Sequence, residues 1–294
     1  MQKNNLFTGA ATALITPLND HGVDFAALDR LVDFQLEAGI PAIVACGTTG
    51  EAATLTQEEH LDVIKRVVQR VDGRACVIGG TGSNNTAHAI QLTKAACDLG
   101  VDSCLVVTPY YNKTTQFGLI ASFTAIADAS SKPLILYNVP SRTGLNILPS
   151  TYAALADHPM IAGIKEANGN MSAAAETMRL VGDRLAMYSG EDAMITPMLS
   201  IGCQGVISVL ANVLPKETNE ICTRFFDGDV RGSAQLQLQL LPLINALFSQ
   251  TNPIPVKAAL SRMGYCEDRL RLPLIPMEEP FRSKLFAAMS ALGL

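Results

Sequence analysis

Eight short apolar runs, rich in β-branched residues, recur through the first 210 residues and are separated by segments with helical periodicity. Continuous apolar runs of this length are typical of parallel strands that are covered on both faces. They lie at 12–16, 42–46, 75–79, 104–109, 134–140, 161–167, 185–190 and 205–209. Eight strand–helix units fit a closed barrel, so we expect an α/β protein with a (β/α)8 TIM barrel.

The segments between these runs carry helix start and stop signals. Residues 24–38 have apolar side chains at helical spacing and end at Gly39, which can adopt positive φ. Thr56 and Glu59 form a capping box in front of the next helix. The glycine-rich stretch 79–85 follows a strand but lacks the G-x-G-x-x-G pattern, which argues against a dinucleotide-binding fold.

The pattern changes after about residue 225. The segments 230–249, 255–264 and 280–292 have the pattern of helices, with no strands between them. A chain of 294 residues suits a barrel of about 250 residues with an addition. We therefore expect a catalytic (β/α)8 barrel at 1–225 and a C-terminal helical appendage at 226–294.

Charge and cysteine usage narrow the class of protein. The net charge is −5 and no block of like charges occurs, so nothing indicates nucleic acid or an anionic membrane as partner. The N-terminal segment lacks the features of a signal peptide, and no stretch approaches the roughly 20 apolar residues of a membrane span. Seven scattered cysteines without a C-x-x-C pair indicate reduced thiols in a cytoplasmic protein.

Lys165 is the most informative residue, because it lies near the C-terminal end of an apolar strand, where barrel active sites lie. Strand alternation places Ile161, Gly163 and Lys165 on one face, and the small Gly163 suits the barrel interior. Burial lowers the pKa of a lysine and favours the neutral amine, which can form an imine with a ketone. The strand alone leaves open that Lys165 reaches solvent or pairs with Glu166.

Tyr137 ends the preceding predicted strand, so we expect it one strand away from Lys165. A phenol beside an amine can carry the protons that imine formation requires. The alternative is a core tyrosine whose hydroxyl is satisfied elsewhere.

Two further strand ends could hold a carboxylate. Loop 47–51 offers backbone N–H groups and the hydroxyls of Thr48 and Thr49, although an ordinary glycine turn is the alternative. Arg142 follows the Tyr137 strand, and its planar guanidinium can hold a carboxylate through two hydrogen bonds. Taken alone, Arg142 reads more simply as a surface arginine.

Tyr110 and Tyr111 are adjacent on another strand-end loop. Two neighbouring side chains cannot both point inward, so one of them faces a partner or solvent, and the former would be an interface. The sequence shows neither a Ser-His-Asp arrangement nor a carboxylate cluster, and we expect no metal site and no cofactor. An imine is then the expected electron sink.

Seven motifs carry a resemblance to one family, in the same order and spacing. They are GTTGE at 47–51, TPYYNK at 108–113, YNVPSRTG at 137–144, GIKEANGN at 163–170, SGEDA at 189–193, GVISVLANV at 205–213 and NPIPVK at 252–257. On these motifs, which span nearly the whole chain, the sequence resembles the dihydrodipicolinate synthases. That family belongs to the superfamily of pyruvate-dependent class I aldolases and N-acetylneuraminate lyases.

The resemblance implies an aldol condensation in lysine and diaminopimelate biosynthesis. Pyruvate would form an imine with Lys165, and its enamine would attack the aldehyde of L-aspartate-4-semialdehyde to give 4-hydroxy-tetrahydrodipicolinate. Tyr137, Thr48 and Tyr111 match the proton-relay residues of the family, in which the last tyrosine is donated across a dimer interface. The resemblance also implies a homotetramer built from two dimers.

Three further positions match substrate-binding residues of the family. Arg142 matches the residue that binds the semialdehyde carboxylate, Thr49 matches a group that binds the pyruvate carboxylate, and Ile207 matches a carbonyl near the site.

The sequence departs from the family pattern at the lysine feedback site. His60, Asn84 and Tyr110 match lysine-inhibited members, whereas Gln57 and His88 stand where some of those members have His and Glu. An imidazole cannot replace the carboxylate that accepts hydrogen bonds from the ammonium group of lysine. We therefore expect weak or absent inhibition by lysine.

Two alternatives remain. N-acetylneuraminate lyases and 2-keto-3-deoxy sugar-acid aldolases use the same lysine and tyrosine, but they need polar groups for a polyol where this chain has Arg142. A catalytically silent ligand-binding barrel is the second alternative, and it would not require both Lys165 and Tyr137.

Overall fold

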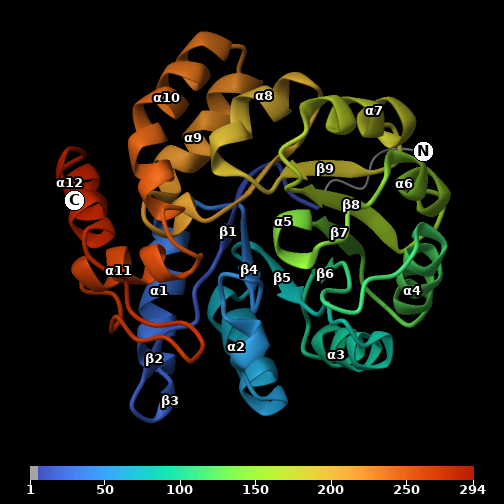
Figure 1. Ribbon diagram of the computed structural model, residues 1–294, viewed down its shortest axis with the longest axis horizontal. Helices are drawn as coiled ribbons and strands as arrows, with labels where there is room; N and C mark the ends of the chain where they lie inside the picture. The colour runs from blue at the N-terminus through green and yellow to red at the C-terminus, as the bar shows by residue number, and fades with distance from the viewer. Residues whose placement is uncertain (1–5) are drawn as a thin grey trace.

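Eight parallel strands close into a barrel in the computed structural model, which describes residues 6–294 (Figure 1). Their order around the barrel is β1-β10-β9-β8-β7-β6-β5-β4, and β1 pairs with both β10 and β4. The strands are β1 (Gly9–Ala13), β4 (Ala42–Ala45), β5 (Cys76–Gly80), β6 (Ser103–Val107), β7 (Leu134–Asn138), β8 (Ile161–Glu166), β9 (Ala186–Ser189) and β10 (Gly205–Ser208). The predicted TIM barrel is confirmed.

Seven of the strands agree with the predicted runs to within two residues, but the first run, at 12–16, was placed too late. β1 ends at Ala13. Leu14 still donates to the Val44 carbonyl of β4 at 3.0 Å, and the two residues after it bond to segments beyond the strand ends. The Ile15 N–H donates to Asn212 Oδ1 at 3.1 Å, and the Thr16 hydroxyl donates to the Gly50 carbonyl at 2.7 Å. An antiparallel pair that the sequence did not indicate follows, β2 (Leu18–Asn19) with β3 (Gly22–Val23).

Helices surround the barrel on its outside, except the short α5 (Pro140–Thr143), which lies at the strand ends, where Arg142 and Thr143 line a cavity (Figure 1). They are α1 (Phe25–Glu37), α2 (Gln57–Val71), α3 (Thr86–Asp98), α4 (Gln116–Asp128), α5 (Pro140–Thr143), α6 (Pro149–Leu155), α7 (Met171–Val181), α8 (Ile195–Ser200) and α9 (Pro215–Phe226). The Thr56–Glu59 capping box is present in front of α2, and Gly39 follows α1 with φ +75°. None of the helices within residues 6–294 is long and apolar enough to cross a membrane.

Three more helices follow α9: α10 (Val230–Leu247), α11 (Ile254–Arg262) and α12 (Phe281–Ser290). Their bounds agree with the predicted helices to within two residues. α10 packs against α9 and α12, and α11 packs against α12. In Figure 1 these helices lie on the outside of the barrel, with α11 beside α1.

The strands separate two apolar cores. Inside the barrel, side chains from every strand except β8 form one cluster that includes Ile78, Ile135, Tyr188 and Ile207. The other faces of the strands pack against the helices in a larger cluster. Consecutive side chains of a strand point to opposite sides, so the two clusters lie on the two faces of the sheet, and the interior positions of β8 are Gly163 and Lys165.

The barrel closes where β10 meets β1, and this contact leaves no room for a side chain. Gly9 pairs with Gly205, and a Cβ atom on Gly205 would lie 1.7 Å from the Gly9 carbonyl oxygen. Both glycines have positive φ, +103° and +154°, which L side chains rarely adopt. Two glycines therefore set the distance between the first and last strands.

We predict that Gly205→Ala destabilises the fold by more than about 4 kcal/mol, because the added Cβ would overlap backbone that cannot move without opening the barrel. Gly39→Ala is the control, since its φ is +75° and no atom lies within 4 Å of its added Cβ. The control should cost only about 1–2 kcal/mol for the left-handed backbone. Thermal unfolding followed by circular dichroism distinguishes the two, and equal losses in both variants would contradict the closure argument.

Candidate active site

Lys165 and Tyr137 lie side by side at the C-terminal ends of two neighbouring strands. They are direct register partners in β8 and β7, and Lys165 Nζ lies 4.2 Å from the centroid of the Tyr137 ring. Each residue is only 6% exposed. The predicted proximity of the two side chains is confirmed, and the alternative of a solvent-exposed lysine is wrong.

One part of the strand alternation was wrong. The β7–β8 register shifts by one residue after Leu134, which pairs with Ile161, whereas Ile135 pairs with Gly163. Ile161 consequently packs in the outer core, on the other side from Lys165. Gly163 does face the interior, but its space is filled, because an added Cβ would lie within 3.6 Å of Ile135 and Tyr188.

Burial and two charged residues set the pKa of Lys165. Burial lowers the pKa to about 8, the carboxylate of Asp192 raises it, and the guanidinium of Arg142 lowers it. Burial also raises the pKa of Tyr137 to about 12, opposed by Arg142 and by a hydrogen bond with the Thr48 side chain. Near neutral pH Tyr137 therefore keeps its proton, and a small fraction of Lys165 is the neutral amine that can attack a ketone.

Asp192 is a site residue that the sequence did not single out, although it belongs to the SGEDA motif. It is 2% exposed, and its Oδ2 accepts hydrogen bonds from the N–H groups of Val209 at 3.1 Å and Leu210 at 2.8 Å. These bonds fix the segment that follows β10, two residues after Ile207, which is buried in the interior cluster. Asp192 therefore holds a strand end in place and supplies the negative charge that acts on Lys165.

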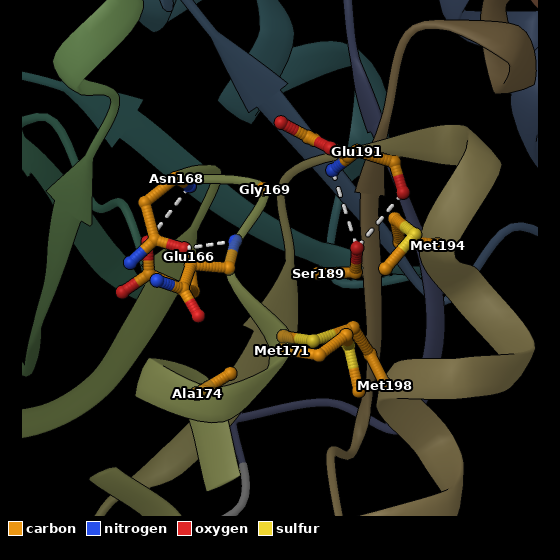
Figure 2. Close-up of a pocket in the computed structure, with 10 residues that line it drawn as sticks. Glu166, Asn168, Gly169, Met171, Ala174, Ser189, Glu191, Met194 and Met198 are labelled. Carbon is orange, nitrogen blue, oxygen red and sulfur yellow. Dashed lines mark hydrogen bonds between the residues drawn. The ribbon is translucent and has the colours of Figure 1, made fainter. Parts of the chain in front are cut away.

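The residues next to Lys165 and Tyr137 are hydrogen-bonded to each other on the outer side of the barrel. Asn138 Nδ2 donates to Glu166 Oε1 at 3.0 Å, and the Tyr152 hydroxyl donates to Glu166 Oε2 at 3.2 Å. The Asn168 N–H also donates to Oε1, as Figure 2 shows. Burial raises the pKa of Glu166 to about 7. Glu166 thus faces away from Lys165, and the alternative that the two residues form an ion pair is wrong.

A cavity of about 550 Å³ lies beside Tyr137 at the strand ends. Its lining includes Thr48, Tyr137, Arg142 and Asn252, the last of which comes from the segment just before α11. Asn252 Nδ2 donates to the hydroxyl of the buried Thr49 at 2.9 Å, and its carbonyl accepts from Arg142 Nη2 at 3.0 Å. The sequence placed NPIPVK among its motifs but gave Asn252 no role, because the contact joins residues 203 positions apart.

Tyr111 is not brought to the other residues within a single chain. It is 94% exposed and has a left-handed backbone with φ 70°, whereas Tyr110 is 36% exposed and lines the cavity. Asn84 braces this loop by donating to the Tyr110 carbonyl at 3.2 Å. The two tyrosines therefore point in different directions, as the adjacency argument required.

Four of the five positions of the expected feedback site line the same cavity, and Asn84 does not. Gln57, His60, His88 and Tyr110 all contribute to its wall. His60 is buried, its Nε2 lies 2.7 Å from the Gly80 carbonyl oxygen, and burial lowers its pKa. Residues 6–294 contain no group of three or more His, Cys, Asp or Glu side chains that could hold a metal ion.

Comparisons with known proteins agree with this geometry. Residues 6–292 match the model of the dihydrodipicolinate synthetase family. A 4-hydroxy-tetrahydrodipicolinate synthase from Trichlorobacter lovleyi is 52% identical over 284 residues, which cover 97% of this chain and 98% of that protein. Another from Caldicellulosiruptor saccharolyticus is 54% identical over 290 residues, which cover 98% of each.

Among solved structures, the chloride-inhibited dihydrodipicolinate synthase of Acinetobacter baumannii complexed with pyruvate has 44% sequence identity and a TM-score of 0.95. The match covers 97% of this chain and 99% of that one. The present chain therefore belongs to the dihydrodipicolinate synthetase family.

Proposed function

We propose that this chain is a lyase that condenses pyruvate with L-aspartate-4-semialdehyde to give 4-hydroxy-tetrahydrodipicolinate, through an imine on Lys165. The single observation that carries the proposal is the buried amine of Lys165 against the Tyr137 ring, at the strand ends of the barrel. Relatives that are about half identical to this chain over nearly its full length bear the name of the synthase for this product.

Imine formation uses the two buried side chains. The neutral amine of Lys165 attacks the C2 carbonyl of pyruvate, and the resulting carbinolamine loses water to give the protonated imine. Each of these steps moves a proton, and the phenol of Tyr137 can donate and recover it. Thr48, which hydrogen-bonds to Tyr137, and Tyr111 complete the proposed proton relay.

The carboxylate of pyruvate is proposed to bind loop 47–51. The hydroxyl of Thr49 already accepts a hydrogen bond from Asn252, which leaves its proton free to donate to a carboxylate. The carbonyl of Ile207, at the end of β10, is proposed to face the bound substrate from the other side.

Carbon–carbon bond formation follows loss of a C3 proton from the imine. The enamine attacks the aldehyde carbon of the semialdehyde, and Arg142 is proposed to hold the carboxylate of that substrate. The amine of the new adduct then attacks the imine carbon, which closes the ring and releases Lys165. Arg142 lines the cavity, and its Nη2 donates to the Asn252 carbonyl. Its other guanidinium N–H groups are proposed to bind the carboxylate.

The exposure of Tyr111 supports assembly of several chains. We propose a homotetramer made of two dimers, in which Tyr111 of one chain completes the relay of its partner.

We also propose that the protein acts in the cytoplasm, that the catalytic barrel spans 1–225 with an appendage at 226–294, and that lysine inhibits it weakly because of Gln57 and His88. The comparisons do not favour a sugar-acid aldolase or a silent binding barrel.

Lys165→Ala should abolish both turnover and the pyruvate adduct that borohydride reduction traps, because no other amine is proposed to form the imine. Turnover is measured by coupling to a reductase that oxidises NADPH. Turnover that persists in the variant would place the nucleophile elsewhere. Adduct formation without condensation in the unaltered protein would indicate a related aldolase with another acceptor, and no adduct at all would indicate a binding protein.

Arg142→Ala should damage use of the semialdehyde far more than use of pyruvate. Loss of a charge-assisted contact of this kind costs about 1.5–3 kcal/mol, or roughly 10- to 150-fold in kcat/KM for the semialdehyde. The rate of pyruvate adduct formation serves as the internal control. Equal losses with both substrates would remove the assigned role.

The rate of imine formation should rise with pH and level off above about pH 8, because only the deprotonated amine of Lys165 attacks pyruvate. Asp192→Asn removes a carboxylate that stabilises the ammonium, so the rise should move to lower pH. Glu166→Gln, on the outer side of the strand, should leave the position of the rise unchanged. Stopped-flow measurement of adduct formation tests this, and a shift to higher pH in Asp192→Asn would contradict it.

A further inference from the structure

The segment that follows α10 returns to the mouth of the barrel and touches the loop at the end of β4. Asn252, Lys257 and Arg271 all contact residues between 49 and 59. Lys257 belongs to α11, a helix outside the eight strand–helix units (Figure 1). Its ion pair with Glu51 connects this helix to loop 47–51, the proposed binding site of the pyruvate carboxylate.

The central contact is a buried ion pair between Lys257 and Glu51. Their side chains are 0% and 1% exposed. Lys257 Nζ also donates to the Arg269 carbonyl at 2.8 Å, and the Arg271 N–H donates to Glu51 Oε2 at 3.1 Å. Both charges are therefore tied into the C-terminal segment by hydrogen bonds as well as by each other.

Glu51 ends the GTTGE loop in a conformation that needs support. Its φ is +54°, in the left-handed region that non-glycine residues seldom adopt. Such a backbone persists when the surrounding structure fixes it. The ion pair with Lys257 and the hydrogen bond from the Arg271 N–H hold the Glu51 carboxylate in place. They thereby also restrain Thr48 and Thr49, which precede Glu51 in the same loop.

A second contact reaches the hydroxyl itself. Asn252 Nδ2 donates to Thr49 Oγ1 at 2.9 Å, while the Asn252 carbonyl accepts from Arg142. One residue thus orients both groups that are proposed to bind the two substrate carboxylates. Arg271 also pairs with Glu59 and donates to the Thr54 carbonyl at 2.8 Å. These contacts hold the segment that follows loop 47–51.

Stability alone does not account for the Lys257–Glu51 pair. Removing two charges from water costs about as much as their attraction returns, and apolar residues of similar volume often replace such a pair without loss. The position of the pair explains its presence better, because Glu51 ends loop 47–51 and Lys257 belongs to helix α11.

We propose that Lys257 and Asn252 are positioning residues of the active site, which hold loop 47–51 in the geometry that binds the pyruvate carboxylate. The inference rests on the proposed function, because it assigns these residues to that reaction. In this proposal the C-terminal segment sets the geometry of the active site as well as packing on the outside of the barrel.

The test compares Lys257→Met in the full chain with Leu285→Ala. Leu285 is buried in α12, so its truncation weakens the appendage without touching the loop. Rates of pyruvate adduct formation are measured over a range of pyruvate concentrations, at a temperature well below the melting point of either variant. We expect Lys257→Met to lower the second-order rate constant by about 10- to 100-fold, chiefly through weaker saturation by pyruvate.

The control should remain within about twofold of the unaltered protein at a comparable loss of melting temperature. Equal rate constants for Lys257→Met and Leu285→Ala would overturn the proposal. If the unaltered protein forms no adduct, the proposed function fails instead, so the two failures are distinguishable.

Two more variants keep the test independent of folding. Glu51→Gln with Lys257→Met buries no unpaired charge, and it should show the same weak saturation if Lys257→Met alone does not fold. Asn252→Leu keeps the ion pair and removes the donor to Thr49, so it should also raise the pyruvate concentration for half-saturation. An Asn252→Leu variant with unaltered saturation would overturn the role given to Asn252.

Discussion

Contact between the backbones of β1 and β10 closes the sheet, and the rest of the architecture depends on it. Gly9 and Gly205 approach so closely that a Cβ atom on Gly205 would overlap the Gly9 backbone. Once closed, the barrel has no free edge, and the C-terminal ends of all eight strands lie on one rim. Residues as distant in sequence as Thr48 and Tyr137 thereby come to line one cavity.

The rim places a lysine where water cannot fully solvate it. Burial favours the neutral amine, while the carboxylate of Asp192 limits how far the pKa of Lys165 falls. The same burial keeps the proton on the phenol of Tyr137. One physical cause therefore favours a neutral amine and a protonated phenol side by side, because burial disfavours the charged form of each.

Hydrogen bonds outside the barrel support the pair within it. Tyr137 and Lys165 face the interior, and the next residue of each strand, Asn138 and Glu166, joins the two strands on the other side. On the opposite part of the rim, the C-terminal segment reaches Glu51 through Lys257. Both arrangements use buried polar groups whose partners come from different elements, and this gives the site one fixed geometry.

The sequence by itself determined the order of strands and helices, the position of Lys165 near a strand end and the proximity of Tyr137. Those features follow from local periodicity and from the rule that successive parallel strands are neighbours. Tertiary structure alone decided the early end of β1, the outward position of Ile161 and the contacts of Asp192, Asn252 and Lys257. Their physical reason is shared: a register shift, a buried carboxylate or an ion pair between residues 206 positions apart depends on packing that no local pattern records.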